Sequence, residues 1–93
     1  MSSKPWYLYI ARCNGNTLYT GVTTDVKRRI EEHNKGVGAK YTRGRAPIEL
    51  IYCAEYSNRS EAQIEEARIK KLSRKKKEIL VSEKLLEKFN GQG

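Results

Sequence analysis

Trp6-Tyr7-Leu8-Tyr9-Ile10-Ala11 is a run of aromatic and apolar side chains that favour a pleated surface, so it predicts a β-strand. Asn14-Gly15-Asn16 follows, and it indicates a tight turn because Asn and Gly adopt positive φ at little cost. Leu18-Tyr19-Thr20-Gly21-Val22-Thr23 is then the returning strand. The sequence therefore predicts an antiparallel β-hairpin near its beginning.

The length of the turn decides whether Tyr9 and Tyr19 share a face of this hairpin. A two-residue turn at Asn14-Gly15 places the two rings on opposite faces. A three-residue turn, from Asn14 to Asn16, places Tyr9 opposite Gly21 and both tyrosines on one face. The sequence leaves both turns open, and a site shared by the two tyrosines requires the longer one.

The rest of the chain predicts one more strand and three helices. The first expected helix is capped by Thr23 or Thr24 and carries Val26, Ile30, His33 and Val37 on one face. A basic loop over 38–47 and a strand over 48–54 follow it. The second helix runs from Arg59 to about Leu72, and the third, over 74–90, has Ser73 as its cap and carries Ile79, Leu80, Leu86 and Phe89. This order, β-β-α-β-α-α, predicts the α+β class, with a small antiparallel sheet covered by helices. At 93 residues we expect one domain over 1–93.

The charge of the chain indicates its partner. Nineteen Lys and Arg side chains against eleven Asp and Glu give a formal net charge of +8. Residues 27–45 and 70–93 each carry +5, and they flank an acidic block at 46–69 with −3. Clustered positive charge attracts polyphosphates by counterion release. The pattern favours nucleic acid, with a solvated basic surface or a ribosome-associated chain as alternatives.

The sequence also excludes several classes of protein. No apolar run approaches the ~20 residues of a transmembrane helix, and the first residues lack the apolar core of a secretory signal. Cys13 and Cys53 are too few for a disulfide framework, and with one His they cannot supply a four-ligand zinc site. We therefore expect a cytoplasmic protein without zinc and without a membrane partner, and the oligomeric state stays open.

Two polar side chains on the first predicted helix could belong to a site. Arg29 and His33 are four residues apart, which places them on one flank of that helix. His33 also lies on the apolar stripe, so its ring is at least half turned toward the core. A thiol–imidazole pair with Cys13 is conceivable, but a buried thiol at the end of a strand is the simpler interpretation.

Two glutamates on the second predicted helix are candidate metal ligands. Glu65 and Glu66 each flank the apolar face formed by Ala62 and Ile69, so helical phasing does not choose between them. A carboxylate at such an edge can hold one Mg²⁺, with water and substrate phosphate completing the coordination shell. Simple complementarity to the helix dipole is the alternative explanation.

The order of these residues resembles a known family. Tyr7-Leu8-Tyr9 and Tyr19-Thr20-Gly21 are similar to the two short motifs that name the GIY-YIG nuclease superfamily. Arg29 stands eight residues after Gly21, and His33 stands twelve residues after Gly21. Glu66 begins a segment that is similar to the family's metal-binding helix. The resemblance covers about residues 6–78 and is closest to the short stand-alone bacterial members, which share the stretches at 23–26 and 38–44.

The resemblance implies a fold and a function. The fold is a three-stranded antiparallel sheet with helices packed on it. The function is endonuclease cleavage of nucleic acid, with DNA as the expected substrate, in repair or recombination. The implied site has Tyr9, Tyr19, Arg29 and His33 as catalytic residues and one Mg²⁺ or Mn²⁺ held by Glu66, with Glu65 as the alternative. A binding module that keeps the scaffold without cleaving is the second hypothesis.

The chemistry of these residue types fits phosphodiester cleavage. Arg29 would clamp a phosphate oxygen, and its charge together with the metal would favour the phenolate of a tyrosine. Tyr9 or Tyr19 would then take the proton of the attacking water, oriented by His33. Two departures stand in the motifs: Tyr7 replaces Gly and is expected to narrow access to the site, and Thr20 replaces Ile.

Basic side chains outside this set are expected to contact the nucleic-acid backbone. They are Lys40, Arg43 and Arg45 in the loop and Lys70, Lys71, Arg74 and Lys75 around the start of the last helix. Phosphate contacts give affinity and orientation but carry no sequence information.

Overall fold

The computed structural model describes residues 4–90, with side chains to Lys84. Its elements are β1 (Trp6–Arg12), β2 (Leu18–Thr23), α1 (Val26–Asn34), the short 3₁₀ turn η1 (Lys40–Thr42), β3 (Glu49–Tyr56), α2 (Arg59–Lys70) and α3 (Arg74–Asn90). The three strands form one antiparallel sheet in the order β2-β1-β3. The predicted α+β class and element order are confirmed. The side chains of Leu86 and Phe89 lie outside the described residues.

The hairpin has the register of the three-residue turn. Tyr9 stands opposite Gly21, and Tyr19 stands opposite Ala11. The backbone N–H of Cys13 donates to the carbonyl of Thr17 at 2.8 Å, which closes the turn. Asn16 has a φ of 67°, a conformation that Asn tolerates better than most residues. Both tyrosines therefore lie on one face of the sheet, as a shared site requires.

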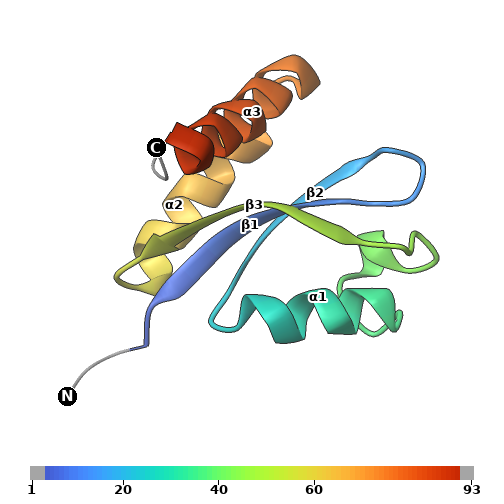
Figure 1. The fold of residues 1–93 in the computed structure, drawn as a ribbon. Helices are drawn as coiled ribbons and strands as arrows, with labels where there is room; N and C mark the ends of the chain where they lie inside the picture. Colours follow the sequence, from blue (N-terminus) through green and yellow to red (C-terminus); the bar gives the residue numbers. More distant parts are fainter. Residues whose placement is uncertain (1–3, 91–93) are drawn as a thin grey trace.

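The sheet is the middle of three layers (Figure 1). α1 covers the face that carries Tyr9, where Ala11, Cys13 and Ile48 are buried with it. α2 and α3 cover the opposite face, and they enclose a separate core of four side chains: Leu8, Ile10, Ile69 and Val81. Because side chains alternate along a strand, β1 contributes to both cores. Tyr9, Tyr19, Arg29 and His33, which we call the polar set, meet on the α1 face, and the strand that carries Tyr9 is buried on both sides.

Helix α1 differs from the prediction at both ends. Its N-cap is Asp25, whose carboxylate accepts from the backbone N–H of Arg28 at 3.1 Å. Thr23, one of the predicted caps, instead accepts from the N–H of Asp25 at 3.1 Å. The helix ends at Asn34, so Val37 lies beyond it and is 67% exposed rather than part of the apolar face. His33 is thus the last buried residue of the helix.

The later elements keep close to their predicted bounds. β3 begins one residue after the predicted strand and continues to Tyr56. α2 is capped by Asn58 and ends at Lys70, two residues before the predicted end. Ser73 accepts from the N–H of Lys76 at 3.2 Å, so it caps α3 as expected. Within residues 4–90, no helix is both long and apolar enough to cross a membrane.

Candidate active site

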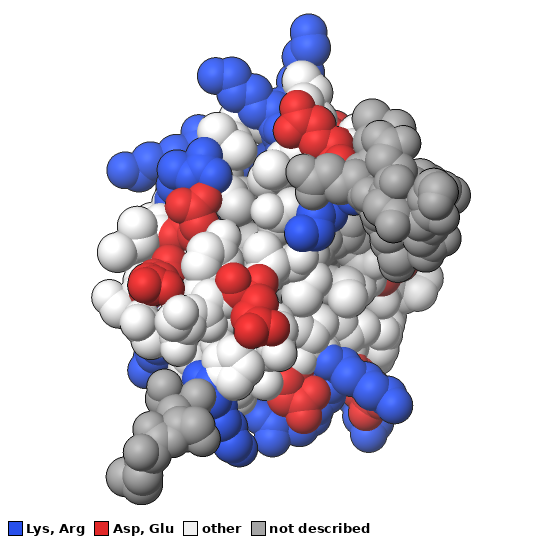
Figure 2. All heavy atoms as spheres, turned by 60° about the vertical axis from the view of Figure 1, so that its left-hand side comes forward, with Lys and Arg blue, Asp and Glu red and all other residues white. Residues whose placement is uncertain are grey.

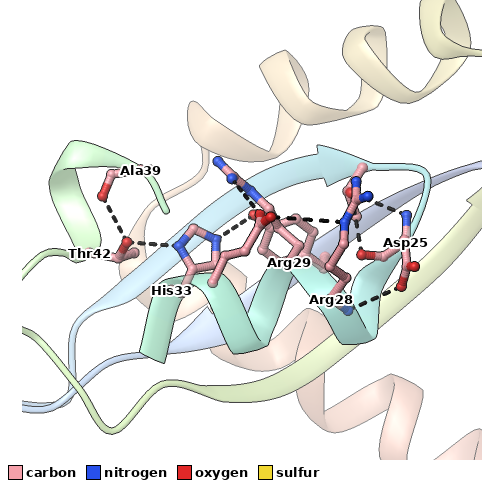
Figure 3. Close-up of polar contacts among 9 residues, drawn as sticks. Asp25, Arg28, Arg29, His33, Ala39 and Thr42 are labelled. Carbon is pink, nitrogen blue, oxygen red and sulfur yellow. Dashed lines mark hydrogen bonds and ion pairs between the residues drawn. The ribbon is translucent and has the colours of Figure 1, made fainter. Parts of the chain in front are cut away.

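The centre of the polar set is a chain of three buried side chains. The hydroxyl oxygen of Tyr9 lies 2.8 Å from Nε2 of His33, and Nδ1 of the same ring lies 2.7 Å from Oγ1 of Thr42. Thr42 in turn donates to the carbonyl oxygen of Ala39 at 2.8 Å. His33 is fully buried and Tyr9 and Thr42 are 1% exposed. Figure 3 shows how α1 and the turn after it bring His33 and Thr42 together.

These contacts decide against one alternative that the sequence left open and add one residue that it did not predict. Both ring nitrogens of His33 are engaged by Tyr9 and Thr42, so the alternative thiol–imidazole pair with Cys13 is not formed. Thr42 itself was not predicted, because the segment that carries it was interpreted only as a basic loop for phosphates. Its stretch, shared with the short family members, was the one signal in the sequence that could have drawn attention to it.

Two glycines allow the backbone to approach these rings. A Cβ at Gly21 would stand 2.7 Å from the Tyr9 hydroxyl oxygen, and a Cβ at Gly38 would overlap Nδ1 of His33 and stand 3.0 Å from its Cα. Any other residue at either position would therefore displace a ring. The ring of Tyr9 reaches across Gly21 toward the β2 edge of the sheet, and the chain at Gly38 covers His33.

The protonation of the two rings follows from their burial. Burial raises the pKa of Tyr9 to about 12, although a hydrogen bond from Arg29 and its positive charge act in the opposite direction. Burial, with a contribution from the Arg29 charge, lowers the pKa of His33. At neutral pH Tyr9 is therefore a phenol and His33 a neutral imidazole. Arg29 lowers the pKa of Tyr9, as expected, but in the protein without metal the effect of burial is larger and the hydroxyl keeps its proton.

Arg29 lies between Tyr9 and an acidic neighbour. Nη1 of Arg29 donates to the Glu32 carboxylate at 3.1 Å, and the same guanidinium is hydrogen-bonded to the Tyr9 hydroxyl. The Arg29 side chain is 31% exposed, so a substrate phosphate can reach it from solvent. The structure thus brings Arg29 to the hydroxyl at which the polar chain ends.

Tyr19 completes this group through ring contacts. Its centroid lies 5.3 Å from that of His33 in an edge-on arrangement and 6.2 Å from that of Tyr9. On another side it stacks on Tyr41, with centroids 5.8 Å apart, and the guanidinium of Arg45 stands 4.4 Å from the Tyr41 centroid. Tyr41 was not predicted either. The stack holds Arg45, one of the predicted phosphate contacts, beside the site.

The two candidate glutamates lie in different surroundings. Glu66 is close enough to Tyr9 that its charge raises the pKa of that hydroxyl, and it forms an ion pair with Lys70 at 3.2 Å. Glu65 is paired with Arg68, and its charge raises the pKa of Tyr56. Tyr56 packs against the core that α2 and α3 cover. Of the two carboxylates, it is the charge of Glu66 that acts on Tyr9.

The donor set near Glu66 limits the kind of metal it could hold. Among the described residues no three His, Cys, Asp or Glu side chains gather as a potential metal site. Mg²⁺ commonly binds through one or two carboxylates and keeps water and substrate phosphate as its other ligands. A single carboxylate at Glu66 fits that mode, which depends on the substrate to complete the shell.

The predicted phosphate-binding residues divide into two groups. Lys40, Arg43, Lys71 and Lys75 are exposed. Arg74 is exposed as well, but its guanidinium is engaged by other groups of the protein. It pairs with Glu78 at 2.9 Å and donates to the carbonyl oxygen of Asn16 at 2.6 Å, which ties α3 to the hairpin turn. Figure 2 shows one face on which most Lys and Arg side chains stand near its two ends, with acidic side chains between them.

The two departures in the motifs lie away from this group. Thr20 stands opposite Ile10 on the face covered by α2 and α3, so it lies on the other side of the sheet from Tyr9. Tyr7 shares the face of Tyr9 but borders a groove formed with Val26, Ile30, Cys53 and others, and Tyr19, Arg29 and His33 do not line that groove. The expectation that Tyr7 narrows access to the site has no support in this geometry.

The chain is similar to proteins of the UPF0213 group. A UPF0213 protein of Natronomonas pharaonis is 52% identical over 77 residues, which cover 83% of this chain and 91% of that protein. A UPF0213 protein of Clostridium perfringens is 48% identical over 84 residues, with 90% of each chain covered.

Two structures solved by solution NMR share the fold. The UPF0213 protein BH0048 of Bacillus halodurans is 50% identical with a TM-score of 0.56, over 84% of this chain and 83% of that one. A protein of E. faecalis is 39% identical with a TM-score of 0.59, over 90% and 91%. The profile of the GIY-YIG catalytic domain matches residues 5–78. The chain therefore belongs to the GIY-YIG family, whose catalytic domain is that of nucleases.

Proposed function

We propose that this protein is a metal-dependent endonuclease that hydrolyses phosphodiester bonds in DNA and acts in repair or recombination. The observation that carries the proposal is the environment of the Tyr9 hydroxyl. It meets Nε2 of His33 at 2.8 Å, is hydrogen-bonded to Arg29, and lies within the electrostatic reach of Glu66. A proton acceptor, a cation and a carboxylate around one hydroxyl are the groups that phosphodiester hydrolysis requires.

The geometry supports Tyr9 as the group that takes the proton of the attacking water. A phenol that keeps its proton cannot accept another unless it gives one up. Nε2 of His33 is placed to receive it, so one proton leaves the water and one enters the imidazole. Tyr9 is then neutral before and after the step. Tyr19, which meets His33 through ring contacts, would position substrate and exclude water.

The remaining groups would stabilise charge. Arg29 is exposed enough to meet solvent, and it would bind a non-bridging oxygen of the substrate phosphate. Because Arg29 lies next to Tyr9, the bound phosphate would lie near the group that takes the proton of the attacking water. Glu66 would hold one Mg²⁺ or Mn²⁺, which when bound neutralises charge on the scissile phosphate. The exposed Lys and Arg side chains around the site would contact the DNA backbone without reading sequence.

A second function, nucleic-acid binding without cleavage, is favoured by one observation. The carboxylate of Glu66 is engaged by Lys70 at 3.2 Å, so an incoming metal must displace an ammonium group. If Lys70 stays in place, the fold remains a basic scaffold with an incomplete site. The two functions differ in one measurable respect, the appearance of cut strands in the presence of metal.

The deciding experiment is incubation of labelled duplex, single-stranded and branched DNA with Mg²⁺, with Mn²⁺ and with a chelator. Glu66→Ala and Tyr9→Phe should lose cleavage by about 10²-fold or more while DNA binding persists. Tyr19→Phe keeps the ring contacts and should lose less. Glu65→Ala is the matched control on the same turn of α2 and should cut normally. Binding without cutting on every substrate would support the second function, and equal activity of both glutamate variants would overturn the metal-binding role.

A further inference from the structure

We propose that Thr42 is a positioning residue of the site. By accepting a hydrogen bond from Nδ1 of His33, it fixes the imidazole in the tautomer that leaves Nε2 free to receive the Tyr9 proton. The tautomer is a property of the folded protein by itself. Its consequence for cleavage rests on the proposed nuclease function.

The direction of each hydrogen bond follows from the last group in this row of hydrogen bonds, the backbone carbonyl of Ala39. A backbone carbonyl can only accept, so the single hydroxyl proton of Thr42 is used on Ala39 at 2.8 Å. The oxygen of Thr42 can then serve the ring of His33 only as an acceptor, which places the ring proton on Nδ1. A neutral imidazole has one protonated nitrogen, so Nε2 is bare and accepts from the Tyr9 hydroxyl.

Because the His33 ring is buried, water does not replace its hydrogen-bond partners. His33 is fully buried and its pKa is lowered, so the resting ring carries a single proton at neutral pH, and it would take a second one only during the proposed step. The backbone at Gly38 lies directly against Nδ1, and this leaves Thr42 as the partner on that side. An exposed imidazole would exchange tautomers with water at both nitrogens, but here a removed hydroxyl has no evident replacement.

The opposite tautomer would close the proposed proton path. With the proton on Nε2, His33 would donate to Tyr9, and the tyrosine oxygen would face two donors, His33 and Arg29. Tyr9 could then hand no proton to the ring. Removing the acceptor at Thr42 favours this state because Nδ1 no longer needs to donate.

The tautomer can be measured directly because His33 is the only histidine of the chain. A long-range ¹H–¹⁵N correlation spectrum of the uniformly ¹⁵N-labelled protein at neutral pH shows which nitrogen carries the proton. We expect Nδ1–H in the wild type and in Thr42→Ser, and a shift toward Nε2–H in Thr42→Val, which keeps the shape but lacks the hydroxyl. A wild-type spectrum with Nε2–H overturns the proposal, whether or not Thr42→Val folds.

Cleavage kinetics test the functional consequence separately. Thr42→Val should lower kcat by about 10²-fold with little change in KM, while Thr42→Ser should restore most of the rate. A Thr42→Val protein with the changed tautomer and wild-type kcat would overturn the positioning role. If the wild type cuts no substrate, the nuclease proposal fails, while the tautomer result still stands or falls by the spectrum.

Discussion

The backbone of Gly21 lies so close to Tyr9 that a Cβ there would stand 2.7 Å from the hydroxyl oxygen and 2.8 Å from Cζ of the ring. The aromatic ring cannot bend, so the strand or the whole side chain must move to accommodate a larger residue. β2 thus contributes to the site through a missing side chain as well as through Tyr19. The hydroxyl of Tyr9 reaches its partners at the sheet edge because this space is empty.

Gly21→Ala is expected to disturb both packing and activity. Overpacking of this kind costs about 1–3 kcal/mol in the free energy of unfolding, and it should loosen the contact between Tyr9 and His33. Urea unfolding measures the first effect and the cleavage rate measures the second. Tyr9→Phe serves as the comparison, since it removes the hydroxyl and leaves the backbone space unchanged. Unaltered stability and rate in Gly21→Ala would show that β2 can yield without cost.

The stability of the protein should depend on pH through His33. Burial lowers its pKa in the folded state below the ordinary 6.5, so the unfolded chain takes up the proton first as the pH falls. The contribution of His33 to the free energy of unfolding should therefore be complete above pH 6.5 and should decline as the pH drops below that value.

Urea unfolding at a series of pH values between about 7.5 and 5 isolates this contribution, since carboxylates titrate mainly lower, near about 4. His33→Gln keeps a polar side chain that does not titrate, so its stability should change less across the same range. An equal slope in both proteins would assign the dependence to other groups.

Local patterns in the sequence predicted the sheet, whereas the candidate site residues were implied by the resemblance to the GIY-YIG family. The hairpin follows from two aromatic strands around Asn14-Gly15-Asn16, and helical spacing places Arg29 and His33 on one flank. The choice between the two turns was open because residues 14–16 permit both, and the pairing of Cys13 with Thr17 decides it. Local patterns therefore specify the elements better than their registers.

The loop after α1 shows what a sequence pattern does not contain. Its charges predicted a solvated phosphate-binding loop, yet η1 folds back to bury Thr42 against His33. That contact joins residues nine apart across a non-helical segment, and its direction depends on Ala39. The helix end at Asn34, which leaves Val37 exposed, is equally a matter of tertiary packing. Hydrogen-bond partners of this kind follow no periodicity.

Arg74 should behave as a structural residue rather than as a DNA contact. Its guanidinium joins Glu78 and the carbonyl of Asn16, so Arg74→Ala would remove one of the links between α3 and the hairpin, while the ion pair between Arg12 and Glu78 remains. We expect a loss of about 0.5–1 kcal/mol in the free energy of unfolding, since the ion pair itself is partly exposed. The neighbouring Lys75→Ala is the control and should leave stability unchanged while lowering the salt dependence of DNA binding by about one counterion. If Arg74→Ala lowers the salt dependence of DNA binding and leaves stability unchanged, Arg74 is a DNA contact and not a structural residue.

The ion pair between Lys70 and Glu66 predicts how the protein responds to metal concentration. The ammonium of Lys70 lies 3.2 Å from the carboxylate that is proposed to hold Mg²⁺ or Mn²⁺, so the two cations compete for the same oxygens. Lys70→Gln should lower the metal concentration needed for half-maximal cleavage, because Glu66 no longer has to be freed. Lys71→Gln removes a neighbouring exposed charge that is not in this pair, so it should weaken DNA binding without this shift in metal dependence. A metal titration of the cleavage rate at saturating DNA measures both. A Lys70→Gln protein that needs more metal than the wild type would mean that Lys70 supports the metal site rather than occupying it.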